Sequence, residues 1–374
     1  MCTLLRNGLI ALMALLLAFS CEDEERPPLN LPANYDGSSF ATNASKELAL
    51  QGQLSALTSE AKKGRTAGNL VSEENLIALF ETGNPSLQAI ASGYYAGKIS
   101  ASGGFATQLA LASGGTYTPG LPTGEGGVYG AYLFDENGIE PEQLIEKGLF
   151  GAAFYHRATT LAAGTLTEAS ADQMVALFGA HPDFPNTNNA QTATNPDKFL
   201  ASYAARRDKN DGNGLYTQAK NGFIQLQAAL KAGNEYKTEQ DEALEIIFDA
   251  WEKANAATII NYCHAAISKF SATNPTTDDL ASGLHAYSEG VGFLHGIRMS
   301  NQTFRRITDA EIDALLVLMN APYDGTPTSY KFITDGINEL PKLSQVIETL
   351  QATYGFSDQE VEDFKKNWVA EQGR

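Results

Sequence analysis

One long segment with helical periodicity, residues 239–270, constrains the fold more than any other feature of the sequence. Its apolar residues recur at intervals of three and four, which places them on one face of an α-helix. The residues on that face are Leu244, Ile247, Phe248, Trp251, Asn255, Ile259, Tyr262, Cys263, Ile267 and Phe270. The segment therefore predicts a long helix that buries one face.

Several other segments also predict helices. They are 45–63, 72–80, 85–98, 277–299, 330–353 with a kink or interruption at Pro341, and a last helix to about residue 370 behind a capping box at Ser357–Glu360. The loops 113–130 and 181–196 are long and rich in Gly, Pro, Thr or Asn. Val128 to Phe134, followed by the turn residues 135–138, predicts one short hairpin arm. We expect an all-α protein of antiparallel helical bundles with long loops and at most a small β-hairpin.

The N-terminus predicts export. Arg6 precedes an apolar run from Leu9 to Phe19, which is shorter than the roughly 20 residues of a membrane-spanning helix. Residues 1–20 therefore predict a lipoprotein signal peptide. Ala18 to Cys21 is similar to a lipobox, so Cys21 is the expected lipidated residue. A plain secretory signal that is cut nearby is the alternative.

The segment 21–40 predicts a tether that carries the lipidated cysteine. It begins with the acidic run Glu22 to Glu25 and contains Pro27, Pro28 and Pro32. The acidic run is either a solvated spacer or a signal for export to the outer face of the outer membrane. Residues 41–374 are then expected to form a single helical domain, with two bundle halves as the alternative.

Charge and cysteine content exclude several classes of function. The net charge of −18 becomes −19 when residues 1–20 are removed, because they carry only the charge of Arg6. Such an acidic protein repels nucleic acid and anionic membrane surfaces, and it favours cationic ligands or metal ions. Once Cys2 is removed and Cys21 is lipidated, only Cys263 remains. No intramolecular disulfide or thiolate cluster is then possible.

The segment 277–299 contains the most suggestive polar residues. His285 and Glu289 are four residues apart and so share one helical face, with Ser288 and His295 alongside. Imidazole and carboxylate at this spacing can hold a divalent metal or act as a base with its orienting partner. The alternative is a buried polar network in which a neighbouring helix satisfies His285. Four glycines in this segment indicate close approach of another helix.

Known catalytic motifs are missing from the sequence. Asp208 to Gly214 has Gly212 where a calcium loop of the EF-hand type needs its third ligand, so it predicts a turn before a helix. The sequence contains no H-E-x-x-H, no G-x-S-x-G and no phosphate-binding glycine loop.

Three stretches together resemble a known family. They are Tyr132–Phe134 with Gln143–Gly148, Leu177–Ala180 with Asp183–Pro185, and His285–Gly290 with Gly296–Arg298. The chain resembles a family of uncharacterised Gram-negative lipoproteins, a domain of unknown function related to the imelysin-like proteins. The resemblance covers nearly all of the mature chain, from about Tyr35 onward.

The resemblance implies an imelysin-like all-α body and a role near iron or metal acquisition. The family usually has a His-Trp-Asp-Glu segment where this chain has Ser170 to Gln173. Asp172 matches that segment, whereas Ser170 and Gln173 replace two possible ligands. This difference favours binding over hydrolysis.

We therefore expect an outer-membrane lipoprotein, periplasmic or surface-facing, that binds a ligand as an accessory of nutrient (iron) uptake without acting as an enzyme. The expected ligand is a divalent metal, iron or a metal chelate, and an uptake receptor is the expected protein partner. Candidate metal ligands are His285, Glu289 and Asp172; candidate ligand-binding residues are Ser288, His295 and Arg298.

Two alternatives remain. The first is an imelysin-type metal-dependent peptidase. The second is a glycan-binding surface lipoprotein that uses an exposed aromatic platform, for which the candidates are Tyr94, Tyr95, Tyr117, Tyr129 and Tyr132.

Overall fold

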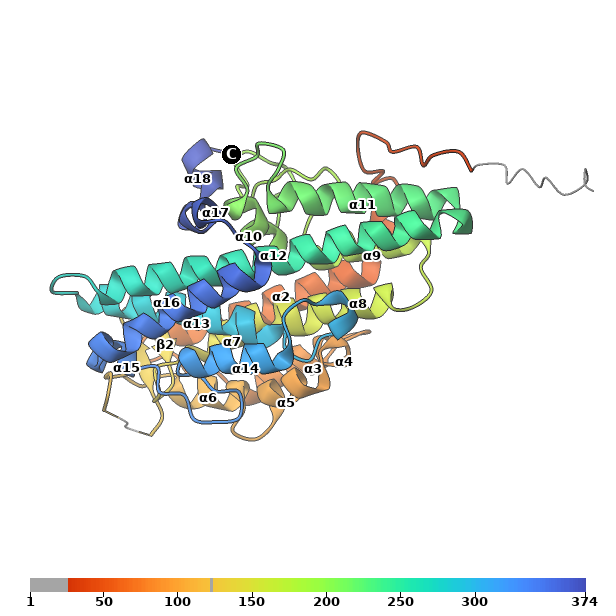
Figure 1. Cartoon of the computed structure of the whole chain (residues 1–374). Coiled ribbons are helices and arrows are strands. Elements are labelled where there is room, and N and C mark those ends of the chain that lie inside the picture. The colour runs from red at the N-terminus through yellow and green to blue at the C-terminus, as the bar shows by residue number, and fades with distance from the viewer. Residues whose placement is uncertain (1–25, 122–123) are drawn as a thin grey trace, which may run out of the picture. The chain divides into compact units, whose positions relative to one another are not determined.

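The computed structural model describes residues 26–121 and 124–374, and most of these residues are helical (Figure 1). The expected signal peptide 1–20, Cys21 and the acidic run lie outside the described residues. In the first half of the described chain the elements are α1 (Phe40–Asn43), α2 (Ser45–Lys62), η1 (Lys63–Arg65), α3 (Glu73–Glu81), α4 (Leu87–Ile90), α5 (Gly93–Ser100), α6 (Phe105–Ala112), β1 (Gly127–Tyr129), β2 (Tyr132–Phe134), α7 (Pro141–Leu149), η2 (Phe150–Tyr155), α8 (His156–Ala162) and α9 (Glu168–Phe178).

The second half contains the two longest central helices, α12 and α13. Its elements are α10 (Phe199–Arg207), α11 (Leu215–Ala232), η3 (Asn234–Tyr236), α12 (Lys237–Phe270), α13 (Thr277–Gly296), η4 (Gln302–Phe304), α14 (Asp309–Leu318), α15 (Lys331–Thr334), α16 (Gly336–Tyr354), α17 (Asp358–Asp363) and α18 (Trp368–Gln372). Residues Leu31–Arg374 form one compact unit. The expected mostly helical fold is confirmed.

The small β content is a single antiparallel hairpin. β1 pairs with β2, with Val128 opposite Leu133. The connecting turn contains Gly130, which has a φ of +57° that favours glycine. The hairpin therefore closes within the segment 127–134, and the turn residues 135–138 follow it rather than connect its strands.

Three expected helices are broken differently from the prediction. The segment 85–98 divides into α4 and α5 at Ser92, whose hydroxyl caps α5 by accepting the Tyr95 N–H. The segment 330–353 breaks at Asp335, and α16 continues through Pro341. The predicted capping box at Ser357 is present, but its helix α17 ends at Asp363, before the short α18.

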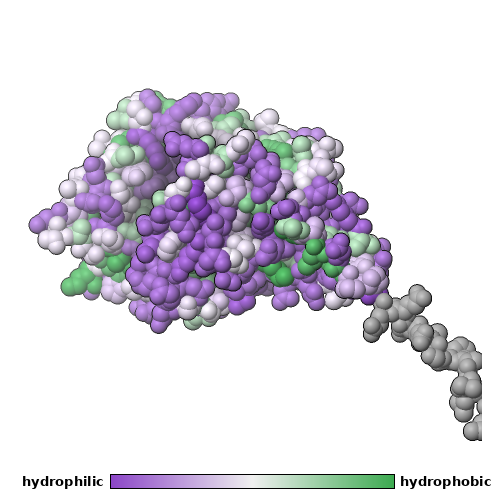
Figure 2. All heavy atoms as spheres, turned by 90° about the horizontal axis from the view of Figure 1, so that it is seen from above, coloured by the Kyte–Doolittle hydropathy of each residue, from purple (hydrophilic) through white to green (hydrophobic). Residues whose placement is uncertain are grey.

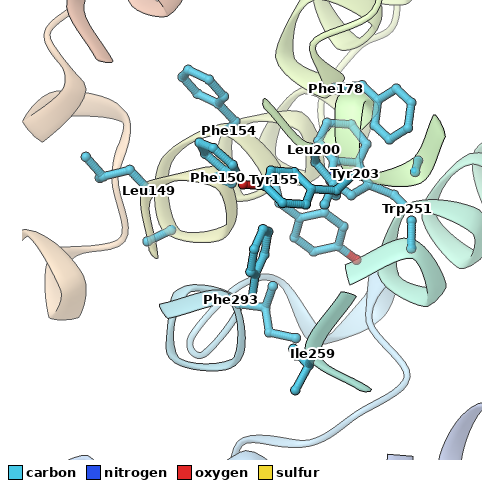
Figure 3. Close-up of a cluster of buried hydrophobic side chains, with 14 of the residues drawn as sticks. Leu149, Phe150, Phe154, Tyr155, Phe178, Leu200, Tyr203, Trp251, Ile259 and Phe293 are labelled. Atoms are coloured by element: carbon cyan, nitrogen blue, oxygen red, sulfur yellow. The ribbon is translucent and has the colours of Figure 1, made fainter. Parts of the chain in front are cut away.

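The core lies where α12 and α13 meet the helices around α7 and η2, as Figure 3 shows. Aromatic rings from separate elements meet edge to face: Phe150 with Phe293, Phe178 with Trp251, and Tyr155 with Trp251. Burial of these large rings supplies much of the hydrophobic stabilisation. The helix predicted from the periodicity of 239–270 is thus a central element of the fold.

The glycines of α13 allow α7 and η2 to approach closely. A Cβ on residue 292 would lie 2.6 Å from the Gln143 carbonyl oxygen, and one on residue 296 would overlap the Gly148 carbonyl. Such close contact brings the polar side chains of α7 and α13 within reach of each other. The sequence-based inference of a close helix contact therefore agrees with the structure.

Part of the expected tether is packed into the helical body. Tyr35 is buried, and its hydroxyl donates to Asp172 on α9 over 2.7 Å. Asp36 pairs with Lys231 on α11. The compact unit therefore includes residues before the boundary expected at residue 41.

The face of the molecule drawn in Figure 2 is mainly polar: hydrophilic residues predominate on it, and hydrophobic ones are scattered. In residues 26–121 and 124–374 no helix has both the length and the apolar character to cross a membrane.

Candidate functional site

The helix α13 contains two polar regions that differ in how their charges are matched. The first surrounds His285 and Glu289. His285 Nδ1 lies 2.6 Å from Glu140 Oε2, so this nitrogen carries the proton that the carboxylate accepts. His285 Nε2 lies 3.6 Å from Glu289 Oε2. The face shared by the two residues therefore meets a third residue, Glu140, which directly precedes α7.

Eight charged side chains form a closed series of ion pairs, which we call the charge ring. In order around the ring they are Arg65, Glu140, His285, Glu289, Lys147, Glu146, Lys62 and Glu142, which returns to Arg65. The pair distances range from 2.5 Å for Arg65–Glu142 to 3.9 Å for Lys62–Glu142. With His285 protonated and all four glutamates ionised, the ring holds four positive and four negative charges. In that state the ring has no net charge.

Burial and neighbouring charges shift the pKa values inside the ring. Burial alone would lower the pKa of His285, but its hydrogen bond to Glu140 and the nearby carboxylates outweigh this effect and raise the pKa. Burial, followed by the negative charge of Glu140, raises the pKa of Glu142 to about 7. Tyr132 stacks on the His285 ring with a centroid distance of 4.1 Å, which limits access to the imidazole.

Ser288 supports the charge ring rather than an open site. It is fully buried, and its hydroxyl accepts the backbone N–H of Glu140 over 3.0 Å. This bond fixes the start of α7 and therefore the Glu140 carboxylate. Directly after α7 the chain forms the π-helix η2, a rare conformation that occurs often near functional sites.

Asp172 lies in a different environment from His285 and Glu289. Its two carboxylate oxygens accept hydrogen bonds from Tyr35 and Asn43, which attach the N-terminal segment to α9. The three residues expected to ligate a metal therefore do not form one site. Among residues 26–121 and 124–374 no group of three or more His, Cys, Asp or Glu side chains is arranged to hold a metal ion.

The second region is a pocket of about 260 Å³ at the C-terminal end of α13, which we call the His295 pocket. The side chains that matter for its chemistry are Lys98, Phe105, Asp135, Val291, His295 and Tyr323. They come from α5, α6, the turn after β2, α13 and the loop after α14. Apolar walls with a few polar groups are typical of small-molecule sites.

His295 is neutral in this pocket. Burial, aided by the positive charges of Lys98 and Arg298, lowers its pKa to about 3. Its Nε2 lies 2.5 Å from the Tyr94 hydroxyl oxygen. At neutral pH the imidazole is therefore a hydrogen-bonding group without a charge.

Arg298 lies beside the pocket and organises its rim. The guanidinium pairs with both carboxylate oxygens of Asp313, at 2.7 and 3.1 Å. It also lies over the rings of Tyr94 and Tyr323, at 4.6 and 3.9 Å from the centroids. Arg298 therefore holds the two aromatic residues in place, and its charge is already paired.

The tyrosines considered for a glycan platform are mostly engaged. Tyr95 and Tyr117 are buried. Tyr94 and Tyr132 are half-buried and contact His295 and His285, respectively. Tyr129 is half-buried and packs edge to face on Tyr117. These five residues do not form an exposed aromatic surface.

Sequence reasoning missed the residues that complete both regions. Glu140 and Lys147 complete the ring, whereas Lys98 and Asp135 line the pocket. They lie far from α13 in the sequence, so no local spacing joins them to it. For Lys147 the available signal was the stretch Gln143–Gly148, which carries part of the family resemblance and lies within α7.

The fold and the two regions define a mostly helical protein with a ligand-sized pocket. Residues 178–357 match a family model described as a domain of unknown function (DUF4856). The matched segment contains all of α13 but neither Glu140, Lys98 nor Asp135. Comparisons with curated proteins and with solved structures gave no match.

Proposed function

We propose that the protein is a cell-envelope lipoprotein that binds a small ligand in the His295 pocket and serves nutrient uptake without transforming that ligand. The pocket itself is the observation that carries this proposal. It combines apolar walls with an ammonium group, a carboxylate and a neutral imidazole within about 260 Å³. That volume is slightly below the roughly 300–1,000 Å³ of pockets for drug-sized ligands, which favours a small metabolite.

The link to iron rests on the resemblance to imelysin-like proteins. A metal would have to enter as a chelate, because Asp172 is bonded to Tyr35 and Asn43 and cannot join His285 and Glu289. A metal-dependent peptidase needs a set of metal ligands, and the described residues contain no such set, which supports binding over hydrolysis.

The envelope location rests on the N-terminal sequence. Cys21 directly follows the apolar run, and it is the expected site of lipidation. Substitution Cys21→Ser should abolish incorporation of radiolabelled palmitate. Continued labelling of the variant would contradict the lipoprotein assignment.

Ligand binding is tested by analysing the protein as purified from membranes. We expect a denatured sample to release about one equivalent of a small organic molecule, detected by mass spectrometry, while metals are measured in parallel. Iron released together with an organic molecule would indicate a chelate. Iron or zinc without an organic molecule, or neither, would contradict the proposal.

A further inference from the structure

Lys98 is a cation in the His295 pocket without a close counter-ion. It is half-buried, and its ammonium donates to the Tyr323 carbonyl oxygen over 2.5 Å. Burial lowers its pKa, although the more distant Asp324 acts in the opposite direction. Within the described part of the chain, no carboxylate oxygen lies within 4 Å of its nitrogen. Its positive charge is therefore available to an anionic group in the pocket.

Asp135 is an anion in the same pocket without a close counter-ion. It is only 6% exposed, and its Oδ1 accepts the backbone N–H groups of Asn137 and Ile139, both at 2.9 Å. Its Oδ2 has only a long contact of 3.5 Å, to the Asn137 amide. No basic side chain of residues 26–121 or 124–374 lies within 4 Å of it. Burial raises its pKa to about 6.

These two charges are opposite in sign, yet they do not neutralise each other. They belong to separate walls of the pocket, α5 and the turn after β2, and no ion pair joins them. An unpaired charge in a partly enclosed site loses some of its hydration, which is costly. The cost falls when a ligand supplies an opposite charge to each group, and a single molecule can do so only if it carries both signs.

We propose that the His295 pocket binds a small zwitterion, with a carboxylate directed to Lys98 and an ammonium group directed to Asp135. The apolar side chains of Phe105, Ile139, Leu144 and Val291 accept the carbon skeleton between or beside the two charges. This inference rests on the proposed ligand-binding function and names the class of ligand. Amino acids and short ω-amino acids belong to this class.

The charge ring differs from the His295 pocket in the pairing of its charged side chains. Its charged groups are each paired within the protein, so it offers no unbalanced charge to a ligand. The pocket lies on the same helix and contains unpaired groups of both signs. The zwitterion is therefore assigned to the pocket and not to the ring.

The test is calorimetric titration of the full-length protein in detergent with matched probes. The zwitterions are L-leucine, with adjacent charges, and 6-aminohexanoate, with charges at opposite ends. Each is compared with analogues that lack one charged group: 4-methylpentanoate and 3-methylbutylamine for leucine, and hexanoate and pentylamine for 6-aminohexanoate. The variants Lys98→Met and Asp135→Asn each remove one charge at nearly constant volume, and Glu348→Gln on the exposed surface is the control.

At least one zwitterion should bind tenfold or more tightly than both of its analogues. Either pocket variant should weaken that binding about tenfold or more, which corresponds to about 1.4 kcal/mol or more, since each removes a hydrogen bond to a charged group. Glu348→Gln should bind as the wild type does. Binding should also weaken from pH 7.5 to pH 5, because Asp135 then becomes protonated.

Three results would overturn the inference: no binding of either zwitterion, equal binding of an analogue, or binding unaffected by both variants. The analysis of ligand released from the purified protein separates these failures from a failure of the proposed function. An organic molecule of another class, released in stoichiometric amount, would leave ligand binding intact and refute only the zwitterion.

Discussion

The charge ring and the His295 pocket both include residues of α13, but they differ in whether their charged side chains are paired. In the ring, four acidic and four basic side chains satisfy one another, and His285 is held by Glu140. In the pocket, Lys98 and Asp135 remain unpaired, and His295 is neutral. Buried charged side chains that are fully paired help to fix how helices pack, whereas charged side chains without an ion-pair partner are typical of ligand-binding sites. The comparison supports a structural role for the ring and the proposed binding role for the pocket.

The largest effect is expected when a central carboxylate of the ring is removed. Glu140→Ala should destabilise the protein by about 3–5 kcal/mol, because the largely buried cations Arg65 and His285 each lose one of their two carboxylate partners. Chemical denaturation measures the change, with Glu348→Ala on exposed α16 as the control. A loss below about 1 kcal/mol would mean that the ring does not hold α7 and α13 together.

A smaller loss is expected when the contact between α7 and α13 is forced apart. Gly292→Ala places a Cβ 2.6 Å from the Gln143 carbonyl oxygen and should cost about 1–3 kcal/mol. Gly52→Ala is the matched control, since nothing lies within 4 Å of its added Cβ on α2. The control should gain about 0.5–1 kcal/mol from improved helix propensity. Equal effects of the two substitutions would contradict the close contact.

His285 should affect stability without any dependence on metal. His285→Ala should cost about 1–3 kcal/mol, because Glu140 and Glu289 each lose one of their two cationic partners. Melting curves with and without added zinc should shift equally for wild type and variant, and His181→Ala in a loop serves as the control. Metal-dependent stabilisation that is lost only in His285→Ala would support a metal site at the charge ring and contradict its purely structural role.

The pH dependence of this effect follows from the raised pKa of His285. Since the folded protein holds the proton more tightly than the unfolded chain, the stabilisation is fully present below about pH 6.5. It is lost as the pH rises through the higher pKa of the folded state. The difference between wild type and His285→Ala should therefore shrink from pH 5.5 to pH 8.5. A difference that grows over this range would show that His285 is neutral in the ring.

The smallest effect at neutral pH, and the opposite pH dependence, is expected for His295. His295→Phe should cost about 1 kcal/mol at pH 7.5, the loss of one hydrogen bond to Tyr94. The pKa of His295 is lowered to about 3, so its stabilising contribution is present above pH 6.5 and is lost as the pH falls. Relative to wild type, the variant should therefore gain stability from pH 7.5 to pH 5. Parallel pH profiles for His285 and His295 variants would remove the distinction between the two regions.

Much of the local structure could be predicted from the sequence because it depends on nearby residues. The periodicity of 239–270 identified α12. The predicted segment 277–299 matches α13, where Thr276 caps the helix and Asp279 completes the capping box. The break at Ser92 was not predicted. It depends on the Ser92 backbone N–H, which donates to Ala152 in η2, a partner 60 residues away.

The candidate site could be predicted from the sequence only in part. The spacing of His285 and Glu289 correctly indicated a shared face and a polar unit with a neighbouring element. The same reasoning grouped Asp172 with them on the basis of resemblance, although Asp172 bonds to Tyr35 and Asn43. A short interval determines which residues share a helical face, but it does not determine which distant helix lies opposite.

From the sequence we could predict the helical character, the capping box at Ser357, the burial of Cys263 and the shared face of His285 and Glu289, because each depends on composition or on residues within about one helical turn. The packing of distant elements was needed to show that Glu140, Lys147 and Arg65 close the charge ring, and that Lys98 and Asp135 face one pocket without neutralising each other. The physical reason is that electrostatic balance depends on distances between side chains across the whole fold. Two histidines ten residues apart on one helix therefore acquire opposite protonation behaviour.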